Sequence, residues 1–431
     1  MKIELAYGRY GLVVDLPPEA KPQVIRKPEF DLPQDPHVCI SNCLDHSVEV
    51  PPLEMLARGA SSACILICDI TRPVPNNLFL RPLIERLSSA GVDLEEITIL
   101  VATGLHRPNL GVELAELVGD PWVLKNARTV NHDARCDSDH IMLGRTRTRG
   151  TPVGLNRRFV EADLKIVTGL VEPHFMAGYS GGRKVIAPGV AHHSTIRTFH
   201  SAKFMEDPHA TSCRLVKNPL HEEQLEIIQM LESPVLGLNT VIDEERNLAF
   251  ASFGEIIESH QRAVDFVRGM VEIPVGRKFS TIVTSAAGYP LDKTYYQTIK
   301  GMVTPLDILK DKGTLIIASE CSEGLGSSEF RAAQKQLVEL GPSAFLESLM
   351  GKNLADIDEW QTEMQLKPMR IGSIKLYTTG LDITDLEVTG VEQVHSVAEA
   401  VSESIEAHGN SEVAVIPEGP YIVPFSNTAF S

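Results

Sequence analysis

The segment ACILICDITRPVP, residues 63–75, predicts the local fold in the N-terminal part of the chain. Its first six residues are apolar without alternation, which is typical of a strand in a parallel sheet covered on both faces. The polar turn that follows carries Asp69 and Arg72. Beyond the turn, the pattern predicts a helix with Pro82 in its first position that ends at Gly91.

The same strand-then-turn pattern recurs along the chain. The other runs are ITILVATGLHRP (97–108), LKIVTGLVEPH (164–174), STIVTSAAGYP (280–290) and GTLIIASECSEG (313–324). Helical patterns lie between the strands, and this alternation predicts an α/β fold with mostly parallel, doubly wound sheets. Ligands of such sheets bind beyond the carboxyl ends of the strands, so the polar turns can share one crevice.

The length of 431 residues exceeds what one hydrophobic core usually serves, so we expect two domains. Helical periodicity gives way to a proline- and glycine-bearing segment at residues 268–280. This break predicts an N-terminal α/β domain over residues 1–270 and a C-terminal α/β domain over 275–431, with the active site in the cleft between them. The final segment, residues 412–431, holds one more strand that can join either domain.

The composition predicts a soluble cytoplasmic protein without nucleic-acid or membrane partners. The net charge of −17 argues against a nucleic-acid binder, whose surface should be basic. No apolar run approaches the roughly 20 residues that cross a bilayer, and the first residues lack the layout of a signal peptide. The seven cysteines form no CxxC pair, which favours a reduced protein.

The segment VEPHFMAGYSGGRKVIAPG, residues 171–189, combines features that each have an ordinary structural explanation when taken alone. It places His174 ahead of a loop that is followed by Arg183 and Lys184; the loop residues are Gly178, Ser180, Gly181 and Gly182. Glycines often only turn the chain, and a lone histidine or lysine is usually structural. Together they predict backbone N–H groups and cations that hold an anion.

Known phosphate-loop patterns fail at this loop. Counting from Gly178, Arg183 occupies the second glycine position of GxxxxGK[ST], and Val185 follows Lys184. No GxGxxG follows a strand either. The loop is therefore neither that of a standard NTPase nor a dinucleotide fingerprint.

Further candidates lie at other strand ends and on one helix. Arg72 either binds a carboxylate or phosphate through two hydrogen bonds or pairs with Asp69 to fasten its turn. His106 ends another strand and can converge with His174 on one crevice. If Asp292 caps a helix, Gln297 and Lys300 lie three residues apart on one face of it and could point from the second domain into the cleft. The spacing alone favours a solvated amphipathic face.

Metal-ligand patterns are weak in the sequence. There is no HExxH. The neighbours His192 and His193 are poorly spaced as ligands, because adjacent side chains of a regular element point apart. Residues 131–140, NHDARCDSDH, are rich in candidate ligands but are interpreted first as a polar turn.

Five motifs, in this order, resemble the nickel-dependent lactate racemases. They are DITRPVP, ATGLHRP, VEPHFMAGYSGGRKVIAPG, TIRTFHSAKFMEDP and YYQTIK, and the resemblance extends to Trp360. It implies a nickel-pincer nucleotide, that is, a Ni(II) pyridinium-3,5-bisthiocarboxylic acid mononucleotide. It also implies a small 2-hydroxy acid as substrate, and the enzymes of cofactor synthesis as partners.

The resemblance implies roles for individual residues. Lys184 matches the lysine that holds the cofactor, covalently through a thioamide or without a bond, and His200 matches the nickel ligand. His106 and His174 match the paired acid/base residues. The positions that match nucleotide contacts are Asp69, Gly178, Ser180, Gly181 and Gly182. The positions that match the substrate site are Arg72, Gln297, Lys300 and Trp360.

These roles predict a racemase or epimerase that inverts C2 of a 2-hydroxy acid. Hydride transfer to the cofactor, coupled to proton transfer by histidine, would pass through a 2-keto acid. The substrate is lactate or another 2-hydroxy acid such as malate, an aryl-lactate or a sugar acid. Two other classes stay open, a lysine enzyme that uses pyridoxal phosphate and a non-catalytic carrier of the cofactor.

Overall fold

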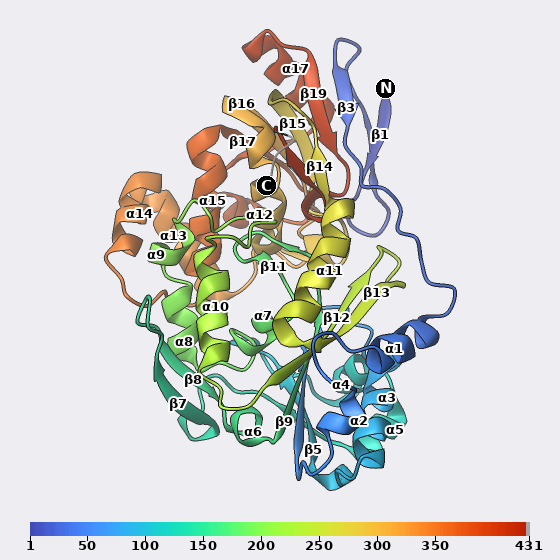
Figure 1. Cartoon of the computed structure of the whole chain (residues 1–431). Coiled ribbons are helices and arrows are strands. Elements are labelled where there is room, and N and C mark those ends of the chain that lie inside the picture. Colours follow the sequence, from blue (N-terminus) through green and yellow to red (C-terminus); the bar gives the residue numbers. More distant parts are fainter. Residues whose placement is uncertain (428–431) are drawn as a thin grey trace. The chain divides into compact units, whose positions relative to one another are not determined.

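Two compact units make up the chain. Figure 1 shows the helices and strands of both, coloured along the sequence. The computed structural model describes residues 1–427. One unit comprises Met1–Pro28, His200–Cys213 and the chain from Met270 onward; the other comprises Glu29–Phe199 and Arg214–Gly269. We call them unit 1 and unit 2. The break expected at residues 268–280 therefore coincides with a change of unit.

Unit 2 is built on a six-stranded sheet with the order β13-β12-β9-β4-β5-β6. All neighbours are parallel except the antiparallel pair of β12 and β13. The strands are β4 (Ala63–Cys68), β5 (Ile97–Ala102), β6 (Arg128–Asn131), β9 (Leu164–Leu170), β12 (Val235–Ile242) and β13 (Leu248–Glu255). The mostly parallel α/β fold is thus confirmed, and the strands expected at 63–75, 97–108 and 164–174 are present.

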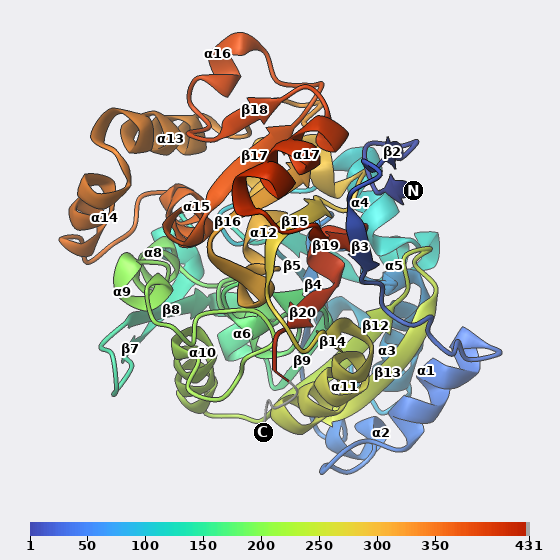
Figure 2. The same cartoon turned by 90° about the horizontal axis from the view of Figure 1, so that it is seen from above.

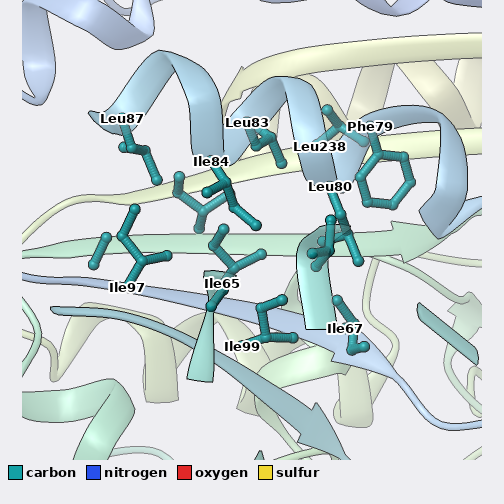
Figure 3. Close-up of a cluster of buried hydrophobic side chains, with 14 of the residues drawn as sticks. Ile65, Ile67, Phe79, Leu80, Leu83, Ile84, Leu87, Ile97, Ile99 and Leu238 are labelled. Atoms are coloured by element: carbon teal, nitrogen blue, oxygen red, sulfur yellow. The ribbon is translucent and has the colours of Figure 1, made fainter. Parts of the chain in front are cut away.

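Helix α3 (Asn76–Ser89) covers one face of this sheet (Figure 3). The expected start at Pro82 was wrong, because Pro82 lies inside the helix. An interior proline costs about 3 kcal/mol. The earlier start lets Phe79 and Leu80 become fully buried, and each such side chain contributes roughly 1.5–3 kcal/mol. Burial of the two side chains together outweighs the proline.

The remaining elements of unit 2 surround the sheet. Its other helices are α1 (Pro36–Asp45), α2 (Leu53–Leu56), α4 (Gly111–Val118), α5 (Pro121–Asn126), α6 (Arg157–Glu161), α7 (Arg183–Ile186), α8 (His193–Phe199), α10 (Pro219–Gln229) and α11 (Ile256–Val271). Its short strand pairs are β7 (His140–Arg145) with β8 (Pro152–Asn156) and β10 (Pro173–His174) with β11 (Gly178–Tyr179).

Unit 1 is built on a second six-stranded sheet with the order β18-β17-β16-β15-β19-β3, in which every neighbouring pair is parallel. The strands are β3 (Lys21–Val24), β15 (Phe279–Ser285), β16 (Leu309–Ala318), β17 (Ser373–Tyr377), β18 (Glu392–Val394) and β19 (Glu412–Ile416). Figure 2 shows β15, β16 and β17 side by side, with α17 (Val397–His408) against them.

Both faces of this second sheet are covered. On one face, Val283 and Ile316 belong to an apolar cluster with Val401 of α17. On the other, α12 (Tyr295–Val303) packs so closely that a Cβ at Gly301 would lie 2.9 Å from Ile317 Cδ1. Double covering explains why these strands are apolar without alternation.

The units differ from the expected ranges 1–270 and 275–431 in two segments. Residues 1–28 belong to unit 1 because β3 pairs with β19. Residues 200–213 belong there because α9 (Ala202–Met205) packs on α15 (Glu359–Ile371), where Arg370 donates to Glu206 over 2.6 and 3.1 Å. The described part of the final segment stays with unit 1; residues 428–431 lie outside the described residues.

The other elements of unit 1 are short strands and helices at its periphery. They are β1 (Lys2–Leu5), β2 (Leu12–Asp15), β14 (Glu272–Pro274), β20 (Val423–Phe425), α13 (Ser328–Leu340), α14 (Pro342–Met350) and α16 (Ile383–Leu386). Strand β20 pairs in parallel with β14. Within residues 1–427, we find no helix with the length and apolarity that a membrane crossing requires.

Candidate active site

Three neighbouring strands of unit 2 end in the polar turns singled out from the sequence. His106 follows β5, Asp69 and Arg72 follow β4, and His174 follows β9. Strand β4 lies between β5 and β9 in the sheet. Because carboxyl ends of parallel strands meet at one edge, these side chains come from adjacent positions.

A hydrogen bond of 2.6 Å joins His106 Nδ1 to Asp69 Oδ2. Thr71 donates its N–H and its hydroxyl to the other carboxylate oxygen. Burial acts to raise the pKa of Asp69, but the hydrogen bonds with His106 and Thr71 and the charge of Arg72 outweigh it and lower that pKa. Asp69 is therefore ionised, His106 Nδ1 donates, and neutral His106 carries a lone pair on Nε2.

Arg72 forms an ion pair with Glu172 across the ends of two strands. Its backbone N–H donates to the carbonyl of Asp69 over 3.1 Å, which tightens the turn after β4. Glu172 lies two residues before His174, so the pair connects the turn of Arg72 to the segment that carries His174. Sequence reasoning missed Glu172, although it stands inside the motif VEPH.

His174 is buried and accepts two backbone hydrogen bonds. The N–H groups of Met176 and Ala177 donate to its Nδ1 over 3.3 and 3.1 Å. Its ring stacks on Phe175 with centroids 5.1 Å apart. Since Nδ1 accepts, the neutral ring carries its hydrogen on Nε2. His106 and His174 are thus held in opposite tautomers.

The glycines of the predicted anion loop are required by close packing. Gly178 has a φ of 78°, and a Cβ there would lie 2.2 Å from the carbonyl oxygen of Arg214. Gly181 also has a φ of 78°, and its Cβ would lie 2.7 Å from Val171 Cγ2. Positive φ and lack of space together demand glycine.

Several polar groups of this loop donate within the protein. Ser180 donates its N–H to the carbonyl of Glu172 over 2.9 Å and its hydroxyl to that of Leu170 over 2.7 Å. Gly182 donates its N–H to Asn239 Oδ1 over 2.9 Å. These bonds anchor the loop to β9 and β12. The predicted nucleotide contacts of the loop must therefore use other groups or follow a rearrangement.

Arg183 lies beneath the loop and not at its open side. Its side chain is buried and donates to the carbonyls of Ala177 and Tyr179 and to His260 Nε2 over 2.9–3.1 Å. Burial lowers the pKa of Arg183 to about 9. The expectation that Arg183 is a second cation for the anion is wrong, because its hydrogen bonds are used to hold the loop.

Lys184 has a strongly shifted titration. Burial, followed by the charges of Arg72 and Arg183, lowers the pKa of Lys184 to about 7. Cys68 and Glu172 act in the opposite direction and raise this pKa. The charges that act on Lys184 therefore include both Arg72 and its ion-pair partner, Glu172. A large fraction of its amine is neutral near pH 7, which is the nucleophilic form.

The remaining predicted site residues belong to unit 1. His200 follows α8 directly, and its ring centroid lies 5.0 Å from that of Trp360 on α15. Helix α12, which carries Gln297 and Lys300, packs against α15. Gln297 Oε1 is buried without a hydrogen-bond partner among residues 1–427. Unit 1 therefore places the imidazole of His200 beside the ring of Trp360, and the neighbouring helix α12 carries the unsatisfied amide oxygen of Gln297.

Asp292 does not cap α12, contrary to expectation. The helix starts at Tyr295, and Asp292 is fully buried two residues before its N-cap residue, Thr294. Asp292 Oδ2 instead accepts the backbone N–H groups of Gly8 and Glu320 over 2.6 and 3.2 Å. It binds the first residues of the chain, which no local pattern indicates.

Comparisons with known proteins agree with this architecture. Residues 7–212 match the Lactate racemase N-terminal domain, and residues 276–423 match the Lactate racemase C-terminal domain. Lactate racemase of Thermoanaerobacterium thermosaccharolyticum is 28% identical over 428 residues, which covers 98% of either chain. Lactate racemase of Lactiplantibacillus plantarum is 30% identical over 383 residues, which covers 88% of this chain and 89% of the relative.

A solved structure extends the similarity to three dimensions. The lactate racemase apoprotein from Thermoanaerobacterium thermosaccharolyticum superimposes with a TM-score of 0.90 at 27% identity, covering 98% of this chain and 100% of the solved one. The α/β fold and these matches define an isomerase of the racemase class. The chain belongs to the lactate racemase family.

Proposed function

We propose that this protein inverts C2 of a small 2-hydroxy acid, lactate or a close relative. The observation that carries the proposal is the opposite tautomer of His106 and His174, which follow β5 and β9 on either side of β4. Inversion requires a proton acceptor and a proton donor for the substrate oxygen in the same turnover. The two relatives named lactate racemase support the choice of substrate class.

His106 is proposed as the base that removes the hydroxyl proton. Its Nε2 carries the lone pair, and the Asp69 carboxylate stabilises the imidazolium that forms. The side chain is 62% exposed, so substrate can reach it. His174 presents Nε2–H, which donates a hydrogen bond to the oxygen on C2.

The opposite enantiomer requires that His174 act as the base. Its Nε2 must then lose its hydrogen, and Nδ1 must gain one. The N–H groups of Met176 and Ala177 would have to leave Nδ1 for this exchange, since two donors cannot face each other. We therefore propose a small movement of residues 175–177 during turnover.

Arg72 is proposed to bind the substrate carboxylate. A guanidinium is a planar fork of N–H donors that matches a carboxylate, and the ion pair with Glu172 holds that of Arg72 at the ends of β4 and β9. Lys300 and Gln297, carried by α12, and Trp360 remain the proposed substrate-site residues of unit 1. Among them, the unsatisfied Oε1 of Gln297 is a buried acceptor that a ligand hydroxyl would satisfy.

The residues fit the proposed nickel-pincer nucleotide. Lys184 offers a neutral amine for attachment, and a shift of its pKa to about 7 is what such a reaction requires. His200 offers an imidazole, a donor suited to nickel beside sulfur ligands. When bound, the cofactor would supply the acceptor for the hydrogen on C2 as hydride. Asp69 and the 178–182 loop remain its proposed nucleotide contacts.

The test is co-expression with cofactor-synthesis enzymes, followed by metal analysis, intact mass and a panel of 2-hydroxy acids. We expect bound nickel, and racemisation of one panel member. A mass increase that Lys184→Ala abolishes would show covalent attachment. A Schiff-base absorbance band without nickel would indicate a pyridoxal phosphate enzyme. Stoichiometric nickel binding without racemisation of any 2-hydroxy acid would indicate a carrier.

We also propose a cytoplasmic location. All seven cysteines are free thiols, which suits a reducing compartment. Fractionation of the native host would test this.

A further inference from the structure

A second histidine cluster lies in unit 2, outside the residues assigned above. It combines the turn after β6 with the start of α8. We call its members, Asp137, His140, His192 and His193, the His192 cluster. The sequence offered both halves as weak ligand candidates, and the fold brings them together.

Three members present ligand atoms to one another. One ligand atom each of Asp137, His192 and His193 lies within 4.8 Å of the others. His192 Nε2 lies 2.9 Å from Asp137 Oδ1, and the two imidazole centroids are 4.2 Å apart. Two nitrogens and one carboxylate oxygen form a donor set that divalent transition metals prefer.

The consecutive histidines converge because the backbone changes conformation between them. Ala191 forms an isolated bridge with Leu155, and His192 donates its N–H to the carbonyl of Gly154. His193 is the first residue of α8. Neighbours point apart on a regular element, but here one residue ends an extended segment and the next begins a helix. The expectation that their spacing is poor was wrong for this reason.

A supporting shell is already present around His192. Its Nδ1 lies 2.7 Å from the hydroxyl of Ser194. The backbone N–H of Ser194 also lies 3.3 Å from Nδ1. When Nε2 binds a metal, Nδ1 carries the hydrogen and donates it to that hydroxyl, and the longer contact with the N–H must open. Metal-bound histidines almost always have such a partner, which fixes the orientation of the ring.

His140 provides an independent indication of a missing ligand. The residue is buried, and its Nδ1 donates to the carbonyl of Cys136 over 2.7 Å. Its Nε2 is therefore a buried lone pair, and it has no partner among residues 1–427. The ring packs against that of His192 with centroids 4.9 Å apart. A water molecule bound to a nearby cation is a strong donor that would satisfy this nitrogen.

We propose that Asp137, His192 and His193 bind one divalent transition-metal ion, Zn²⁺ or a similar cation, at a site separate from the proposed nickel cofactor. Three protein ligands leave at least one coordination position for water. The ion joins the turn of residues 133–139 to the first turn of α8, the helix that ends one residue before His200.

Charge near the cluster sets the expected strength of binding. His193 begins α8, and Arg197 lies one turn further along the same helix. The charges of Arg197 and Arg135 oppose a cation, whereas Asp137 favours it. The site is therefore weaker than a closed structural zinc site.

Isothermal titration of Zn²⁺ into the full-length protein, stripped of loosely bound metal, tests this proposal. We expect one site that is at least tenfold weaker in Asp137→Asn and His193→Ala. Asp137 is 88% exposed, so its isosteric replacement leaves the fold intact. His37→Ala removes an exposed histidine of α1 and serves as the matched control. His106→Ala separates this site from the Asp69–His106 pair.

The titrations have clear opposite outcomes. Loss of the site in both cluster variants but not in His37→Ala or His106→Ala would support the assignment, as would a visible Co²⁺ spectrum that the cluster variants lack. No Zn²⁺ binding by the wild-type protein would overturn it. Equal binding by the cluster variants, or equal loss in His37→Ala, would overturn it as well.

Discussion

His106 donates from Nδ1 to Asp69 Oδ2 over 2.6 Å, and this bond leaves the lone pair of the neutral imidazole on Nε2. Asp69 is held in place in turn by two bonds from Thr71. The carboxylate thus orients the imidazole and would stabilise its protonated form, the arrangement of an aspartate behind a catalytic histidine.

Replacement of Asp69 by Asn should reduce racemisation strongly. The amide has the same shape but no charge, and its NH₂ group favours the wrong tautomer of His106. We expect kcat to fall by about 10²-fold or more, within the usual contribution of a general base. Initial rates on the preferred 2-hydroxy acid measure this, with cofactor content determined in parallel. Asp93→Asn, at an exposed position, should have full activity; a similar rate in Asp69→Asn would refute the proposed role.

Lys184 should react with amine reagents at unusually low pH. Its amine is deprotonated as pH rises through about 7, whereas an ordinary lysine requires a pH near 10.4. Competitive acetylation of the apoprotein between pH 5 and 11, read by peptide mass spectrometry, gives the midpoint for each lysine. Exposed Lys125 provides the internal reference. A Lys184 midpoint that coincides with that of Lys125 would contradict the depressed pKa.

Removal of the Lys184 amine should stabilise the apoprotein. The pKa of Lys184 is about 7 in the folded state and near 10.4 in the unfolded state, so unfolding takes up a proton between these values. Burial of this amine therefore costs most below pH 7, and the cost disappears as pH approaches 10. Lys184→Met should raise the free energy of unfolding by on the order of 1–3 kcal/mol at pH 6.5. Urea unfolding at pH 6.5 and 9.5 should show a gain that shrinks at the higher pH.

Arg72→Lys should weaken substrate binding. A lysine ammonium is a point charge and cannot pair with Glu172 while it also forms two parallel hydrogen bonds with a carboxylate. We expect KM to rise roughly tenfold, in line with the loss of a charged hydrogen bond. Arg81→Lys, on the exposed side of α3, is the control. An unchanged KM in Arg72→Lys would exclude Arg72 as the carboxylate anchor.

Gly178→Ala should destabilise unit 2 far more than Gly150→Ala. Both glycines have a positive φ, 78° and 71°, so both alanines bear a backbone cost of about 1–2 kcal/mol. Only at Gly178 does the added Cβ collide with a carbonyl oxygen, whereas nothing lies within 4 Å at Gly150. Thermal melts of the two variants compare them directly. Equal melting temperatures would show that the backbone around Gly178 can move away from the carbonyl of Arg214 at little cost.

Sequence reasoning located the strands and the strand-end residues because both depend on local patterns. Runs such as ACILIC are buried on both faces, and a parallel sheet necessarily gathers the turns after them. This is why Asp69, His106 and His174 could be predicted at one edge. Their individual partners could not be predicted, because the pairing of Arg72 with Glu172 depends on three-dimensional contacts between separate strands.

The errors share a physical cause, since tertiary contacts outweighed local preference. Burial of Phe79 extends α3 past Pro82. Asp292 binds the N–H of Gly8, which is remote in sequence. Arg183 was expected among the cations that hold an anion, but it is buried and Nη2 of its guanidinium donates to the loop. His192 and His193 converge only because a helix starts between them.

The parallel pairing of β3 with β19 has a consequence for biosynthesis. Lys21–Val24 leave the ribosome early, but their partner, Glu412–Ile416, is among the last segments translated. The nascent chain must therefore carry an unpaired edge strand for almost its entire synthesis. Unit 2 is translated completely before Met270 and can become compact while synthesis continues. A chaperone that shields the N-terminal segment would therefore matter most for the folding of unit 1.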